Sequence, residues 1–237
     1  YHLCFIKIMA KKGVKNSEVS MNNYCSRLKK LFFNPKKFFK DVDGEKNYKN
    51  PLITYIIIGL VSVVLSLIMN IYLASVINMS GLVIIPAISN LVFGILILFI
   101  TPFVYSVFVH IGVLVFRGKE KFYNTFKPLT YGLSIGQVYG ALVSFLTLIF
   151  FLFIFSTDIL LAIEQGNVPE DMINTKMVVF GVFMFVIYAS MLIHMIYAEV
   201  IGISRFQKIS KFRAFLSIVF VPVILILIGA IFYFIPV

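Results

Sequence analysis

Long uncharged stretches make up most of the chain, and short charged segments separate all of them except the first two, which a short neutral loop joins. Uncharged residues run without interruption over 50–75, 82–116, 128–157, 177–198 and 214–237. Each stretch exceeds the roughly 18 apolar residues that indicate a membrane-spanning helix. The stretch 82–116 is too long for one perpendicular crossing but too short for two crossings and a turn, so it predicts one tilted helix. The pattern therefore predicts an all-α, polytopic integral membrane protein with five transmembrane helices.

Prolines and charges set the expected limits of these spans. Pro51, Pro86 and Pro128 are expected to open the first three, because proline suits the first turn of a helix, and Pro102 is a candidate kink. We expect spans at about 52–75, 86–116, 128–155, 177–201 and 214–235, within a membrane domain at residues 51–237. Residues 1–23 are expected to be an extension to which we assign no function.

The segment 24–50 is basic, yet its apolar residues recur at helical spacing. Asn34 and Pro35 have the order expected of a helix N-cap and first position. Lysines surround the apolar face, which is typical of a helix in the headgroup layer. We therefore predict an N-terminal interfacial amphipathic helix. Its apolar positions are Leu28, Leu31, Phe32, Phe38, Phe39 and Val42.

The basic residues are concentrated in three clusters. Of the 21 Lys and Arg residues, 12 precede residue 51, four lie in 117–127 and four in 205–213. Cytoplasmic loops collect Lys and Arg, so five spans place all three clusters inside, the N-terminus in the cytoplasm and the C-terminus outside. The net charge of +11 thus predicts contact with anionic lipid headgroups rather than nucleic acid. The membrane-surface cations are expected to include Lys29, Lys30, Lys36, Lys37, Lys40, Arg205, Lys208, Lys211 and Arg213.

Small residues recur every fourth position on the third expected span, at Gly132, Gly136, Gly140 and Ser144. Such a row lets another helix backbone approach closely. Two interpretations stay open, packing within one chain or a homodimer face, and the first is favoured. The same stretch matches G-x-S-x-G, but a helix interior is not the strand-to-helix turn that a hydrolase nucleophile needs.

Three ionisable residues fall within expected spans, namely His110, His194 and Glu199. Residues of this kind inside a membrane are candidates for function. Their similar depth permits a His–Glu cluster, either a structural hydrogen-bonded pair or a metal or proton site. The structural pair is favoured because no metal-ligand spacing is present, and we expect no cofactor.

Several short motifs resemble the Ypt-interacting-protein (YIP) domain family of five-span membrane proteins. Asn34-Pro35-Lys36-Lys37-Phe38-Phe39 and Asn50-Pro51-Leu52 with Tyr55 resemble its opening segment. The central series is His110, Arg117-Gly118-Lys119, Phe122, Thr125 and Tyr131, and the closing series is Glu199, Gly202, Ile203, Ser204, Lys211, Arg213 and Ala214. The resemblance implies a five-span fold and a non-enzymatic role.

Eukaryotic members of that family bind Rab-type GTPases and coat components. This chain lacks their Asp-Leu-Tyr-Gly-Pro element before the first span and has a single glycine at Arg117-Gly118. GTPase binding is therefore not expected, and a prokaryotic plasma membrane is the expected location.

The main functional hypothesis is a non-enzymatic membrane scaffold or adaptor, in trafficking or membrane organisation. Its expected partners are the lipid bilayer, anionic headgroups, and either a second copy or another membrane protein. The alternative is a small transporter or channel component that uses His110, His194 and Glu199. An enzyme is not expected, because no paired catalytic groups are present.

Overall fold

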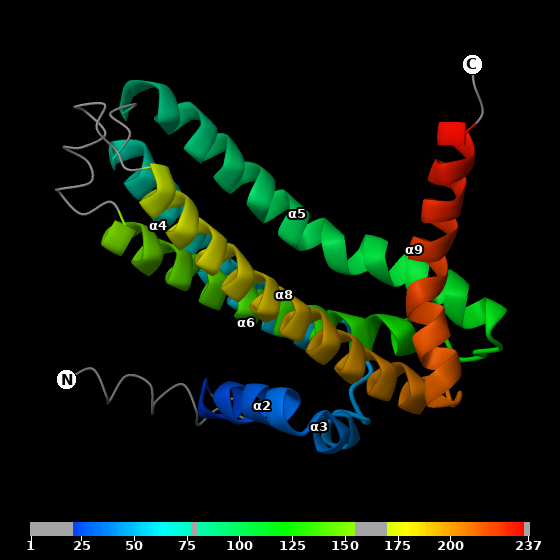
Figure 1. The fold of residues 1–237 in the computed structure, drawn as a ribbon. Helices are drawn as coiled ribbons and strands as arrows, with labels where there is room; N and C mark the ends of the chain where they lie inside the picture. The colour runs from blue at the N-terminus through cyan, green and yellow to red at the C-terminus, as the bar shows by residue number, and fades with distance from the viewer. Residues whose placement is uncertain (1–20, 77–79, 155–169, 235–237) are drawn as a thin grey trace, which may run out of the picture.

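The computed structural model describes residues 21–76, 80–154 and 170–234, and these residues form helices joined by short connections (Figure 1). The helices are α2 (Met21–Phe33), α3 (Pro35–Asp41), α4 (Lys49–Val76), α5 (Ser80–Val115), α6 (Tyr123–Ile154), α8 (Glu170–Phe206) and α9 (Lys211–Phe234). The predicted all-α class is confirmed for these ranges. Most of the N-terminal extension, residues 1–20, lies outside them.

Four helices are long and apolar enough to cross a membrane, within the ranges just given. They contribute Lys49–Tyr72, Ile88–Val115, Tyr123–Leu152 and Met177–Phe206. Residues 82–115 of the predicted stretch lie in one helix, and this helix is continuous through Pro102. The fifth predicted span coincides with α9, and its crossing of the membrane stays a prediction.

Several helix limits differ from those predicted: α5 begins at Ser80, so Pro86 lies inside it rather than at its start. Helix α6 begins at Tyr123, so Pro128 lies inside it rather than at its start. The turn before the proline is held by packing, because Thr125 and Phe126 are fully buried. Helix α8 continues to Phe206 instead of ending near residue 201. Pro128 therefore does not start its helix, because tertiary contacts hold the turn before it in a helical conformation.

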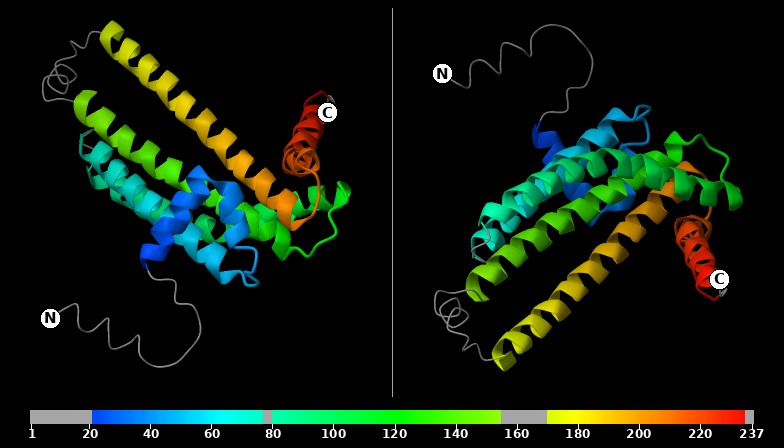
Figure 2. Two further views of the ribbon diagram at one scale, coloured as in Figure 1. Left: turned by 90° about the horizontal axis from the view of Figure 1, so that it is seen from below. Right: turned by 90° about the horizontal axis from the view of Figure 1, so that it is seen from above.

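The helices converge at one end of the molecule and spread apart toward the other (Figures 1 and 2). Helix α6 packs between α4 and α8, while α5 contacts α4, α6 and α9. We call the converging end the basic end; there the connections 42–48, 116–122 and 207–210 meet. The opposite end is called the far end. Both clusters of buried apolar residues lie toward the basic end, one beneath α2 and α3 and the other where α5, α6, α8 and α9 meet.

The N-terminal segment forms two helices rather than one, and their apolar faces contact protein. Leu31, Phe38 and Phe39 are buried against residues of α6 and α8. The predicted cap is confirmed: the Asn34 side chain accepts a hydrogen bond from the Lys37 backbone N–H at 3.1 Å, and proline follows it. An interfacial position is compatible with this packing but stays a prediction. The apolar face stabilises the docked segment instead of entering lipid.

Candidate functional site

The residues that the family resemblance singled out gather at the basic end. Pro35, Phe38 and Phe39 are buried in the docked segment, and Pro51 is buried in the first turn of α4. Thr125 and Tyr131 are buried on α6, while Gly118 is buried just before it. The remaining motif positions are Phe122, Gly202 and Ser204, discussed with their contacts below. These residues come from five different elements, so their common position is a property of the fold.

Glu45 joins the docked segment to two membrane helices. Its carboxylate pairs with the Arg27 guanidinium of α2 and accepts a hydrogen bond from the Tyr131 hydroxyl of α6 at 2.8 Å. The Asn50 amide of α4 donates to the same carboxylate at 3.2 Å. Charge-assisted hydrogen bonds are the stronger kind, and this carboxylate receives three donors. Glu45 therefore fixes the connection between α3 and α4.

Lys127 is buried near the start of α6, with 1% of its surface exposed. Its ammonium donates to the backbone carbonyls of Val42, Asp43 and Glu45 at 3.2, 3.4 and 3.1 Å. It also lies 3.9 Å from the centre of the Phe206 ring, a cation–π distance. The last carbonyls of a helix lack intrahelical donors, so this lysine satisfies the C-terminal end of α3.

A second network fixes the connection between α5 and α6. The buried Gln207 amide donates to the Thr125 hydroxyl at 2.8 Å and accepts from the Glu120 backbone N–H at 3.1 Å. His110 Nδ1 lies 2.8 Å from the same hydroxyl, and its ring packs edge-on against Phe122. The network places residues 119–124 beside the end of α8.

The turn after α5 places an arginine in the left-handed region. Arg117 has φ 69°, and the Gly118 N–H bonds back to the Val113 carbonyl at 2.8 Å. This is the Schellman arrangement that ends many helices. A Cβ at Gly118 would overlap the Val113 side chain, so the single glycine of this motif is needed for space rather than for its φ.

The two other motif positions, Gly202 and Ser204, lie near the end of α8. A Cβ at Gly202 would overlap Pro128 and approach the Phe39 ring, so the glycine permits α8, α6 and α3 to meet. Helix α8 continues past Gly202 to Phe206. The Ser204 hydroxyl donates to the Ile209 carbonyl at 2.7 Å, which fixes the turn into α9.

The three ionisable residues of the spans have separate partners rather than forming one cluster. His110 contacts Thr125, as described above, whereas His194 Nε2 lies 2.8 Å from the Phe32 carbonyl of α2. Glu199 Oε2 accepts a hydrogen bond from the Tyr105 hydroxyl at 2.9 Å. Each therefore joins a different pair of elements. In the part of the chain that the structure describes, no group of three His, Cys, Asp or Glu side chains could hold a metal ion.

Glu199 is the most deeply buried of the three. Gly132 lies directly against it, since a Cβ there would overlap the Glu199 side chain. Its Oε1 atom has no hydrogen-bond partner among the described residues. Gly132 thus provides space for a carboxyl group between α5, α6 and α8.

The rest of the small-residue row packs within the chain. A Cβ at Gly136 would lie 3.5 Å from the Met195 sulfur of α8, and one at Gly140 would lie 3.1 Å from a serine hydroxyl of α4. The Ser144 hydroxyl lies 3.1 Å from that of Ser66, also on α4. The row therefore serves contacts inside one chain.

The predicted surface cations are exposed or partly exposed at the basic end. Three of them form ion pairs: Lys30 with Asp41, Arg205 with Asp43, and Lys208 with Glu120. The hydrogen bond from Lys30 lowers the pKa of Asp41, and that from Lys208 lowers the pKa of Glu120. Lys29, Lys36, Lys37, Lys40, Lys211 and Arg213 are exposed.

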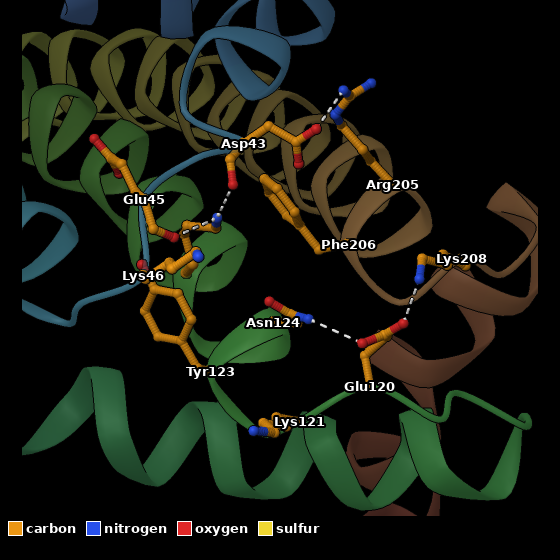
Figure 3. A pocket seen from close by; sticks show the side chains of 11 residues that line it. Asp43, Glu45, Lys46, Glu120, Lys121, Tyr123, Asn124, Arg205, Phe206 and Lys208 are labelled. Atoms are coloured by element: carbon orange, nitrogen blue, oxygen red, sulfur yellow. Dashed lines mark hydrogen bonds and ion pairs between the residues drawn. The ribbon is translucent and has the colours of Figure 1, made fainter.

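A cavity of about 800 Å³ opens between the Arg205–Asp43 and Lys208–Glu120 pairs (Figure 3). Its lining comes from the α3–α4 connection, residues 120–127 and the end of α8. Sequence reasoning counted Lys127 as a loop cation and did not single out Glu45 or Gln207. Two sequence signals could have indicated buried pairing. One is a lysine, Lys127, next to the proline of a span, and the other is a lone glutamate, Glu45, in a basic segment.

The fold and these contacts place the chain among known proteins. The family model for the Yip1 domain matches residues 29–233, a range that includes every motif residue discussed above. Comparison with curated proteins and with solved structures gives no match. The matched range begins in α2 and ends in α9, so it takes in both the docked segment and the membrane helices. The chain belongs to the Yip1 domain family.

Proposed function

We propose that this protein is a non-enzymatic membrane scaffold or adaptor, and that its basic end binds anionic lipid headgroups and a membrane-protein partner. One observation carries the proposal: three basic segments, far apart in the sequence, meet at one end of the helices. Helix α3 presents Lys36, Lys37 and Lys40 there, all exposed. Basic residues beside a membrane attract anionic lipid by about 1 kcal/mol each. The separate structural partners of His110 and His194 favour this role over catalysis.

The proposed topology has five crossings, with α9 as the fifth. Four crossings by α4, α5, α6 and α8 return the chain to the basic end, and α9 then leaves it. Loops rich in Lys and Arg stay in the cytoplasm, which supports an N-terminus inside and a C-terminus outside. The expected location is a prokaryotic plasma membrane.

Lipid selectivity in nanodiscs tests the proposal. The protein is placed in phosphatidylcholine containing a minor fraction of phosphatidylglycerol, and co-purifying lipid is counted by native mass spectrometry. Wild-type protein should retain phosphatidylglycerol above its bulk fraction. The variant K36E/K37E/K40E should lose most of this enrichment, whereas K36R/K37R/K40R should keep it. Absence of enrichment around the wild-type protein would remove the main support for the lipid part of the proposal.

The partner is sought with the same variants by crosslinking in the native membrane. Deletion of α2 and α3 is a poor test, because it would expose the core that Leu31, Phe38 and Phe39 cover. Charge reversal leaves that core in place. A stoichiometric partner lost in K36E/K37E/K40E and kept in K36R/K37R/K40R supports an adaptor; an unchanged set of crosslinks argues against one.

A further inference from the structure

The cavity at the basic end has an excess of positive charge. Five cations and three carboxylates line it: Lys46, Lys121, Lys127, Arg205 and Lys208, with Asp43, Glu45 and Glu120. Each carboxylate is already paired, Asp43 with Arg205 at 2.8 Å, Glu120 with Lys208 at 2.6 Å, and Glu45 with Arg27. The remaining three cations have no carboxylate partner within 4.0 Å among the residues that the structure describes. The cavity therefore favours an anion.

These three cations differ in what they can offer a ligand. Lys127 directs its ammonium at three backbone carbonyls, so it contributes charge but no free donor. Lys46 and Lys121 are exposed and lie on two sides of the cavity, with the Tyr123 ring near Lys46 (Figure 3). Both residues line the same cavity, and each carries an ammonium donor on a different wall (Figure 3).

The walls of the cavity are fixed before any ligand arrives. Lys127 and Glu45 hold the 42–46 wall, and Gln207 holds the wall formed by residues 120–124. A preformed site of this size suits a small polar molecule or headgroup better than a diffuse counter-ion. The cavity also lies at the ends of four membrane helices, where lipid headgroups are found.

We propose that this cavity binds one lipid headgroup with a phosphate ester and a net negative charge, held by Lys46 and Lys121 and by the charge of Lys127. Phosphate oxygens accept several charge-assisted hydrogen bonds at once, which matches two ammonium donors on different walls. The proposal rests on the proposed lipid binding and makes it specific: a single saturable site, separate from the diffuse attraction of α3.

Native mass spectrometry of the full-length protein in nanodiscs tests this site. Phosphatidylglycerol is titrated into phosphatidylcholine, and we expect one phosphatidylglycerol that survives conditions that strip the rest. In K46Q/K121Q its apparent affinity should fall about tenfold or more, because two charge-assisted contacts are lost. K46R/K121R should retain it, and so should K36E/K37E/K40E, whose changes lie outside the cavity. Thermal unfolding confirms that each variant is folded.

The outcomes of these experiments distinguish the cavity site from the general lipid binding of the proposed scaffold. Enrichment of phosphatidylglycerol without a resistant, saturable lipid would overturn the cavity site and leave the lipid-binding scaffold standing. Equal retention by K46Q/K121Q and wild type would also overturn it. Soluble glycerol 3-phosphate is added to neutral nanodiscs as a second arm. Binding there that depends on Lys46 and Lys121, with no retained lipid, would show a site for a free phosphate ester and reject the lipid assignment.

Discussion

The two ends of the helices differ in how their side chains are organised. At the basic end, polar side chains with partners from other elements surround buried aromatic residues. Toward the far end, large apolar side chains of α8 such as Val178 and Phe185 are 65% and 72% exposed. Within a bilayer this exposed surface faces lipid, which is as apolar as the side chains themselves. Tertiary specificity is therefore concentrated where the helices meet water and headgroups.

The comparison shows where polar contacts replace the hydrophobic effect. Lipid provides no hydrophobic driving force between helices, so packing and hydrogen bonds must hold them together. Glu45, Lys127 and Gln207 each join elements from distant parts of the sequence at the basic end. We expect substitutions at this end to change stability more than comparable substitutions toward the far end.

The largest expected effect comes from Lys127→Met. Loss of the ammonium removes three hydrogen bonds to carbonyls of the α3–α4 connection and the contact with Phe206. We expect the free energy of unfolding to fall by about 3 kcal/mol. Unfolding in mixed detergent micelles measures it. The exposed Lys211→Met is the matched control, with an expected change within about 0.5 kcal/mol. Equal effects of the two changes would contradict the role given to Lys127.

A pair of glycines tests the two ends directly. A Cβ at Gly112 would overlap the backbone carbonyl of Ser217 on α9, whereas one at Gly181 meets nothing within 4 Å. Gly112→Ala should therefore destabilise the protein by about 2 kcal/mol through overpacking. Gly181→Ala should stabilise it by about 0.5–1 kcal/mol through helix propensity. If both changes had the same sign in one unfolding assay, the contrast between the ends would fail.

A smaller effect is expected where Arg117 ends α5 with a positive φ. Glycine adopts this conformation without steric penalty. Arg117→Gly should raise the free energy of unfolding by about 0.5–1 kcal/mol. This gain is smaller than the steric penalty of a non-glycine residue at positive φ, because glycine is also freer in the unfolded chain. A thermal melt of the two proteins in the same detergent measures the difference. An unchanged or lower melting temperature would mean that the arginine side chain stabilises the turn.

The smallest expected effect concerns pH and the pair Glu120–Lys208. The hydrogen bond with Lys208 lowers the pKa of Glu120 below 4.5, and the same bond raises the pKa of Lys208 above 10.5. The stabilising effect is therefore present from about pH 5 to 10. It is lost as pH falls through the lowered pKa of Glu120, or rises through the raised pKa of Lys208. Because both groups are on the surface, the effect on stability is small.

Carbon-13 NMR of the Glu120 carboxyl measures this pKa directly. Lys208→Gln should raise it toward 4.5, and Lys211→Gln should leave it unchanged because Lys211 is not in the pair. If the Lys208 change left the Glu120 pKa where it was, the pair would not persist in solution.

The sequence could predict the helices and their place in a membrane, but only part of the site. The N-cap at Asn34 and the uninterrupted helix over 82–115 followed from local chemistry and length. The role of Pro128 as a helix start did not hold, because buried neighbours stabilise the turn before it. That His110, His194 and Glu199 lie within long apolar helices could be read from the sequence, whereas their different partners could not.

What the sequence determined by itself is the alternation of apolar and charged stretches. This alternation specifies an all-α membrane protein, because a bilayer admits only segments that satisfy their own backbone hydrogen bonds. The tertiary structure alone decided which polar groups meet: Glu45 with Arg27 and Tyr131, Lys127 with the end of α3. Glu45 lies 18 positions from Arg27, whereas the two contacts to α6 join residues 85 and 86 positions apart, and no local periodicity encodes such pairings. The cavity between them exists only once all the walls are in place.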